Sequence, residues 1–170
     1  MSEGVRSDAD PVGPLYRLPL AHFTAGRNAL AKELTKSGDR AGAAAVKALR
    51  KPTVAAWALN QLAHERPGDI EALLEAGEAV RAAQDQALAG DASALRGAGQ
   101  HLQESVTRLT EAAAAGLDAP ENQRDRIRET LRAAAVEDEA GAQLRAGRLT
   151  EDLTPAGFGL GDAPATSLSA

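Results

Sequence analysis

Large apolar residues recur every three or four positions along most of the chain, which is the spacing of one buried helical face. The first such run covers about 19–37. Its apolar face consists of Leu20, Phe23, Leu30 and Leu34. Pro19 suits the first turn because its fixed φ is that of a helix, and Gly38 is a typical residue to end one. The pattern therefore predicts a first helix over about 19–37.

The same criterion predicts six further helices. They cover about 40–50, 52–66, 69–89, 92–115, 120–137 and 139–146. Gly90 and Asp91 separate the two longest helices, which are similar in length, so we expect an antiparallel pair. The predicted fold is all-α, a helical bundle of six to seven helices with a long central antiparallel helical hairpin.

Both ends of the chain lack this periodicity. Residues 1–18 are predicted to form a mobile N-terminal arm that could fold back onto the helices through Leu15 and Tyr16. Residues 154–170 are rich in Gly, Pro, Ser and Ala and are predicted to be a disordered C-terminal tail. Residues 19–153 then form a single helical domain, for which we expect one core.

The helix predicted over 52–66 has two different faces. One is aliphatic, and the opposite one consists of Trp57, Asn60, Gln61 and His64. These polar residues have two interpretations. In the first, Trp57 anchors the N-terminal arm through an N–H bond to a carbonyl, while Asn60 or Gln61 binds backbone groups nearby. In the second, the face is part of a recognition surface for another molecule.

Basic residues gather just before this helix. Pro52 disfavours helical geometry at Lys51, which predicts a tight corner between two helices, flanked by Lys47 and Arg50. Within residues 17–51 there are eight basic and two acidic residues, whereas residues 67–170 hold nine basic and eighteen acidic ones. The formal net charge of −5 is therefore divided unevenly, and the N-terminal part could attract an anionic partner.

Arg27 interrupts the apolar face of the first predicted helix. Its aliphatic stem could pack against neighbours while the guanidinium reaches water or a carboxylate. The alternative is that Arg27 contacts an anion on a partner. Both interpretations remain open from the residues alone.

The sequence offers few groups for catalysis or metal binding. It has no cysteine, and its three histidines, His22, His64 and His101, belong to different predicted helices. It contains no phosphate-binding loop or dinucleotide fingerprint, and nothing selects an unequal pair of carboxylates for acid–base work. We therefore expect a non-enzymatic protein with no catalytic residues, no metal, no cofactor and no small-molecule substrate.

Composition bears on location and partners. No window approaches the roughly 20 apolar residues of a membrane span, and the first nineteen residues lack the apolar region of a signal peptide, so we expect a soluble, cytoplasmic protein that binds no membrane. The chain has 39 alanines and 21 leucines. Because each buried alanine methyl removes little area from water, a protein partner or self-association could supply missing burial.

These features favour an interaction or regulatory module that docks an anionic or acidic protein. The predicted partner-binding residues are Lys47, Arg50, Lys51, Trp57, Asn60, Gln61, His64 and Arg27. The alternative is a DNA-binding transcriptional regulator that uses residues 40–66 as a helix-turn-helix-like unit. Two observations disfavour nucleic acid: the predicted link is short and without glycine, and the overall pI is about 5.2.

Several short motifs carry a family resemblance. They are Leu49-Arg50-Lys51-Pro52, Ala55-Ala56-Trp57-Ala58 with Asn60, Leu131-Arg132-Ala133-Ala134-Ala135, Leu144-Arg145-Ala146-Gly147-Arg148-Leu149 and Pro155-Ala156-Gly157-Phe158-Gly159. In these the chain resembles a group of Ala- and Arg-rich helical proteins from high-GC actinobacteria. The resemblance covers most of residues 15–160. The group has no established activity, so the resemblance implies a helical fold and no mechanism.

Overall fold

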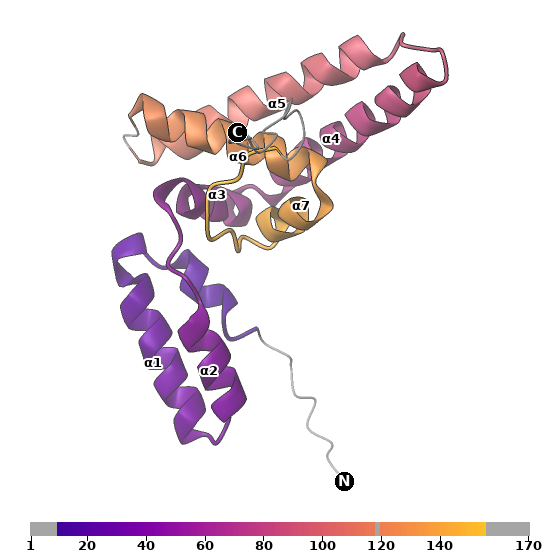
Figure 1. Cartoon of the computed structure of the whole chain (residues 1–170). Helices are drawn as coiled ribbons and strands as arrows, with labels where there is room; N and C mark the ends of the chain where they lie inside the picture. The colour runs from indigo at the N-terminus through magenta and orange to yellow at the C-terminus, as the bar shows by residue number, and fades with distance from the viewer. Residues whose placement is uncertain (1–9, 118–119, 156–170) are drawn as a thin grey trace, which may run out of the picture.

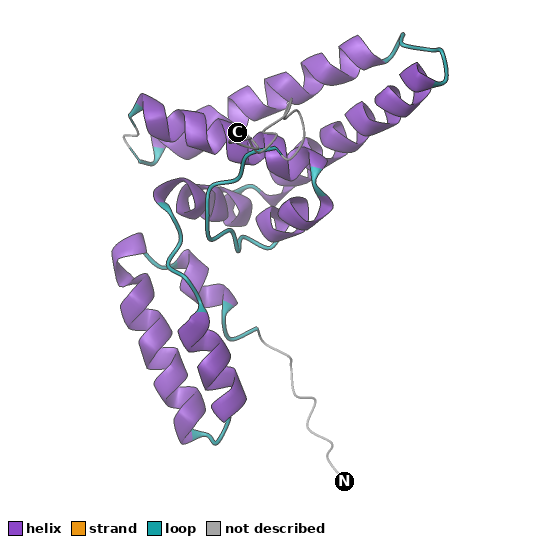
Figure 2. Ribbon diagram, viewed as in Figure 1, coloured by secondary structure: helices purple, strands orange, loops and turns teal. Residues whose placement is uncertain are grey.

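The computed structural model describes residues 10–117 and 120–155. Seven α-helices lie within them, preceded by the 3₁₀ turns η1 (Gly13–Arg17) and η2 (Leu20–His22). The helices are α1 (Phe23–Lys36), α2 (Arg40–Ala48), α3 (Val54–Glu65), α4 (Pro67–Leu88), α5 (Leu95–Ala115), α6 (Glu121–Val136) and α7 (Asp138–Arg145). Every regular element among the described residues is helical (Figure 2), which confirms the predicted all-α fold.

The two longest helices, α4 and α5, form the predicted antiparallel hairpin (Figure 1). Gly90 follows α4 with φ of 105°, a left-handed conformation that glycine adopts without a Cβ penalty. Gly38 ends α1 in the same way, with φ of 91°. Both helix ends lie where glycine predicted them.

Buried apolar side chains form two clusters, although the sequence led us to expect one core. The larger cluster is formed by the five helices α3, α4, α5, α6 and α7 and includes Leu59, Leu73, Leu109 and Leu131. The smaller cluster joins η1, α1 and α2; its fully buried members are Leu15, Tyr16, Phe23, Ala31 and Val46. We call residues 12–49 the N-terminal lobe and residues 54–149 the bundle. In Figure 1 the α1–α2 hairpin extends away from the bundle.

Residues 50–53 connect these two parts, and here the structure differs from the expected tight corner. Leu49 already has an extended backbone, and α3 begins only at Val54, after Thr53. The Thr53 side chain accepts a hydrogen bond from the Ala56 N–H at 3.2 Å and so caps α3. Thr53 is therefore the N-cap, and Pro52 precedes the helix instead of opening it.

Close helix packing in the bundle depends on glycine at two contacts with α6. A Cβ at Gly77 of α4 would overlap the carbonyl oxygen of Ala135 in α6. At Gly141 of α7, a Cβ would lie 2.9 Å from the carbonyl oxygen of Ala134. Because these glycines lack side chains, α4 and α7 can approach the backbone of α6 directly.

The described ends of the chain are attached to these helices. Within the range predicted as an N-terminal arm, η1 is folded and buries Leu15 and Tyr16 in the lobe. Arg148, just after α7, forms an ion pair with Asp10. The rest of the predicted arm, residues 1–9, and residues 156–170 of the predicted tail lie outside the described residues. The assignment of 19–153 to one domain stays a prediction.

No helix among residues 10–117 and 120–155 has both the length and the apolar character required to cross a lipid bilayer.

Candidate functional site

The polar face of α3 holds the N-terminal segment by its backbone. Trp57 donates its indole N–H to the carbonyl of Leu18 at 2.8 Å, and Gln61 donates to the carbonyl of Tyr16 at 2.7 Å. The Trp57 ring is half-buried and also packs against the bundle core. These contacts are those expected if Trp57 anchors the N-terminal segment. They occupy the Trp57 and Gln61 N–H donors that a recognition surface would need for a partner.

Asn60, one turn along α3 from Trp57, binds a different part of the chain. Its Nδ2 donates to the carbonyl of Leu149 at 2.9 Å, and its Oδ1 accepts the Leu149 N–H at 2.8 Å. Asn60 and Leu149 are both 0% exposed. The expectation that Asn60 contacts a partner is therefore wrong: its amide replaces the backbone partners that a buried extended segment would otherwise lack.

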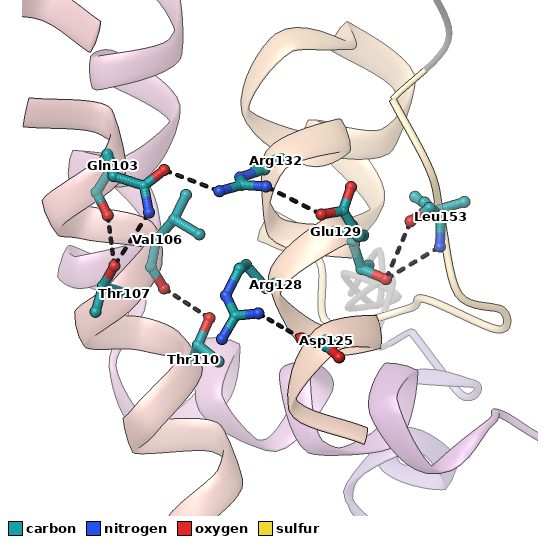
Figure 3. Close-up of polar contacts among 10 residues, drawn as sticks. Gln103, Val106, Thr107, Thr110, Asp125, Arg128, Glu129, Arg132 and Leu153 are labelled. Atoms are coloured by element: carbon teal, nitrogen blue, oxygen red, sulfur yellow. Dashed lines mark hydrogen bonds and ion pairs between the residues drawn. The ribbon is translucent and has the colours of Figure 1, made fainter. Parts of the chain in front are cut away.

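The same extended segment is fixed at two further points. Thr53 donates its backbone N–H to the Thr150 carbonyl at 3.1 Å and its hydroxyl to Asp152. The buried Thr130 hydroxyl of α6 accepts the N–H of Leu153 at 3.0 Å, and Figure 3 shows Leu153 lying against α6. We call residues 147–153 the strap. It crosses α3 and α6 and completes the bundle core with Leu149.

His64 also faces the strap. A Cβ at Gly147 would lie 2.7 Å from the imidazole Nε2, so the ring packs directly against that glycine. The Nε2 atom is buried and makes no hydrogen bond among the described residues. Burial lowers the pKa of His64 from its ordinary 6.5, and the positive charge of Arg17 lowers it further. The His64 ring thus packs against the strap, and its buried location disfavours the charged form.

Arg27 is the fifth predicted partner-binding residue that makes a contact within the chain, and it supports the end of α2. Its Nη1 donates to the carbonyl of Leu49 at 2.8 Å, the first residue after that helix. Its Nε and Nη2 contact the Asn28 amide oxygen at 3.3 and 3.1 Å. The guanidinium therefore binds groups that a helix end leaves without partners.

The remaining predicted residues, Lys47, Arg50 and Lys51, are exposed. Arg50 lies 3.8 Å from Glu151 of the strap, and both side chains are largely exposed, so this ion pair contributes little to stability. Lys47 and Lys51 form no ion pair with any described residue. A partner-binding role for these three stays a prediction.

The structure adds three cations to this surface that the sequence analysis did not single out. Lys32 and Lys36 of α1 are four residues apart and share a helix face, and Arg40 opens α2 seven residues before Lys47. All three are exposed, and none pairs with a carboxylate in the described part of the chain. In the sequence, these three residues were visible only as part of the excess of basic residues within 17–51.

Helices α2 and α3 do not pack as a helix-turn-helix. Their side chains belong to different clusters: α2 packs with α1 in the lobe, and α3 packs with α5 and α6 in the bundle. The DNA-binding motif needs the first helix to support the second, with the start of the second free to enter a groove. Here Thr53, the N-cap of α3, is bound to Thr150 and Asp152 of the strap, so the geometry differs from that motif. The DNA-binding alternative stays a prediction.

Several charged side chains on the bundle surface, mainly on α6 and α7, form ion pairs within the chain. A groove of about 390 Å³ between α4, α6 and α7 is lined by Arg81 and Arg145, which pair with Asp138 and Glu71. On the neighbouring face Arg132 of α6 contacts Glu129 and reaches Gln103 of α5 (Figure 3). Among the described residues no three His, Asp or Glu side chains converge as a metal site would require.

Comparison of the chain with protein-family models, with curated proteins and with solved structures finds no match. The resemblance to the actinobacterial group stays a prediction from the motifs. The feature that bears most directly on function is therefore the group of exposed cations in and next to the N-terminal lobe.

Proposed function

We propose that the protein is a non-enzymatic interaction module of the cytoplasm, and that its N-terminal lobe docks an acidic helical protein. The observation that carries this proposal is a set of exposed cations: Lys32, Lys36, Arg40 and Lys47 on the α1–α2 hairpin, and Lys51 just after it. We call this set the basic surface. Unpaired cations on a projecting hairpin create a positive potential that accelerates encounter with an acidic partner.

Small residues between these cations favour a helix as the docked element. Exposed alanines occupy much of the outer surface of α2; they are Ala41, Ala44, Ala45 and Ala48. On α1, Ala25 and Ala29 are exposed and four residues apart. Because the distance between packed helices depends on the side chains at the contact, such a surface allows a partner helix to approach closely.

Nucleic acid is the less favoured partner. The helix-turn-helix geometry is absent, and the net charge of −5 opposes non-specific attraction of a polyanion to the molecule as a whole. Protein docking needs only a local match of charge and shape, which the hairpin provides.

The test measures binding of fluorescent poly-L-glutamate by anisotropy at low ionic strength, with duplex DNA as a second probe. We expect Lys32→Glu/Lys47→Glu to weaken polyglutamate binding at least about tenfold, since each lost contact of this kind contributes of order 1 kcal/mol. The matched control is Arg96→Glu/Arg108→Glu on α5, which changes the net charge equally at two exposed cations.

An equal loss of binding in both double variants would show that only total charge matters and would contradict the proposal. Tighter binding of the wild type to DNA than to polyglutamate would favour the nucleic-acid alternative. Melting temperatures of both variants should stay near wild type, since all four positions are exposed.

A further inference from the structure

The α4–α5 hairpin has the opposite charge to the N-terminal lobe. Residues 67–115 contain eight acidic and three basic residues. On α4, Glu75, Glu78 and Asp85 are exposed, and none lies within ion-pair distance of a cation among the described residues, although Glu78 interacts electrostatically with Arg145 of α7. Glu78 and Asp85 are seven residues apart, which places them on one face of the helix. We call Glu75, Glu78 and Asp85 the acidic row.

The acidic row and the basic surface share their spacing and their exposed alanines, although Arg81, which pairs with Asp138, stands between Glu78 and Asp85 on α4. Ala79 and Ala82 are exposed on α4 beside Glu78 and Asp85, as alanines are exposed beside Arg40 and Lys47 on α2. In both helices two like charges stand seven residues apart, which is a rise of roughly 10 Å. Helix α2 laid along α4 could therefore bring both cations to both carboxylates at once, with small residues between them.

Within one chain this contact is not made. Helix α2 packs with α1 in the N-terminal lobe, while α4 packs with α5, α6 and α7 in the bundle. The outer ends of the two hairpins also point away from each other (Figure 1). The complement to each surface is thus available on another copy of the same chain.

We infer that the acidic partner of the basic surface is a second copy of this protein, docked through α4. This inference rests on the proposed function and names the partner of the same surface. Two chains related by a two-fold axis would form the contact twice, α2 of each copy lying on α4 of the other. Without closure, the same contact would link copies into an open chain. Alanine-lined helices in contact would also supply the apolar burial that the small N-terminal core lacks.

Charge exchange between two variants tests this directly. Variant A carries Arg40→Glu/Lys47→Glu, and variant B carries Glu78→Lys/Asp85→Lys. Each variant alone presents like charges to its own second copy, so each should be monomeric. In the mixture the acidic hairpin of variant A faces the basic α4 of variant B, and the unmodified surfaces also match, so association should return.

The measurement is molar mass by sedimentation equilibrium at low and high salt, with circular dichroism to show that each variant is folded. We expect self-association of the wild type at low salt, an affinity loss of at least tenfold in each variant, and recovery in the equimolar mixture. A monomeric wild type at high protein concentration and low salt would overturn the inference. So would variants that associate as well as the wild type, because another surface would then be responsible.

The binding of polyglutamate separates the two proposals. If the wild type is monomeric but binds polyglutamate through Lys32 and Lys47, the partner is a different acidic protein and only the inference of self-association fails. If it neither associates nor distinguishes the two double variants in polyglutamate binding, the proposed function fails as well.

Discussion

The N-terminal lobe and the bundle are both built from alanine-rich helices, but they bury these helices to different extents. Each bundle helix packs against at least two others, and large leucines such as Leu59, Leu109 and Leu131 are completely enclosed. The lobe has two helices, and its small core depends on the rings of Tyr16 and Phe23, whose centroids are 5.5 Å apart. A two-helix lobe leaves more of its helical surface exposed, which suits docking, whereas the bundle supplies stability.

The two parts also differ in how they use charge. Most arginines of α6 and α7 are paired, for example Arg145 with Glu71, and that contact lowers the pKa of Glu71 below its ordinary value. Cations of the basic surface have no such partners among the described residues. Much of the charge on α6 and α7 is thus paired within the chain, whereas the basic surface of the lobe and the acidic row of α4 are available to another molecule.

The largest effect is expected where the bundle is most tightly packed. Gly77→Ala would force α4 away from the carbonyl of Ala135, and we expect a loss of about 3 kcal/mol in the free energy of unfolding. The control is Gly97→Ala on exposed α5, where an added Cβ meets nothing within 4 Å. That change should stabilise the protein by up to about 1 kcal/mol through helix propensity. Urea denaturation measures both, and similar effects would contradict the packing argument.

The second-largest loss of stability is expected when the hydrogen bonds between Asn60 and the strap are removed. Asn60→Leu leaves the buried N–H and carbonyl of Leu149 without partners, and we expect destabilisation of about 2–4 kcal/mol. Thr130→Val removes the acceptor for only the half-buried Leu153 N–H and should cost about 1 kcal/mol. Thermal denaturation compares the two. If Asn60→Leu proved neutral, the strap would not contribute to the stability of the bundle.

A change at the junction should affect the lobe more than the bundle. Trp57→Phe keeps an aromatic ring but removes the N–H that binds the Leu18 carbonyl, with an expected cost of about 1 kcal/mol. Limited proteolysis should then cut residues 50–53 faster, while helices of the bundle stay protected. Equal loss of protection throughout the chain would show that the lobe and the bundle unfold together.

The smallest expected effect is a dependence on pH through His64. The pKa of His64 in the folded state lies below 6.5. At pH values between that pKa and 6.5, His64 therefore binds a proton more readily in the unfolded chain than in the folded one. The free energy of unfolding should therefore fall as the pH drops below 6.5, until the folded-state pKa is reached. In His64→Gln this slope should be flatter between pH 7 and 5.5. Chemical denaturation at a series of pH values measures the slope, and an unchanged slope would exclude His64 as its source.

Helix positions could be predicted from the sequence because they depend on local signals. Apolar spacing identified all seven helices, and Gly38 and Gly90 marked two helix ends correctly. The start of α3 was placed too early because Pro52 was taken as its first turn. The competing signal was Thr53, whose side chain caps the helix.

The sequence left two interpretations of the α3 polar face open and could not decide between them, because the choice depends on contacts between distant parts of the chain. Asn60 binds Leu149, 89 residues away, and the strap around Leu149 has no periodicity to reveal its position. The same holds for Trp57 and Gln61, whose partners are backbone carbonyls without any residue signature. The basic surface was visible in the sequence as an excess of basic residues. Its separation from α3 could not be predicted, because it depends on the extended conformation of residues 50–53.

The account depends most on the separation of a lightly packed, outward-facing N-terminal lobe from a well-packed bundle. Native-state amide hydrogen exchange, at a protein concentration low enough to prevent association, measures this separation for each helix. The account predicts that amides of α1 and α2 exchange through openings of lower free energy than those of α3 and α6, which stay protected meanwhile. Equal opening free energies for all four helices would contradict it.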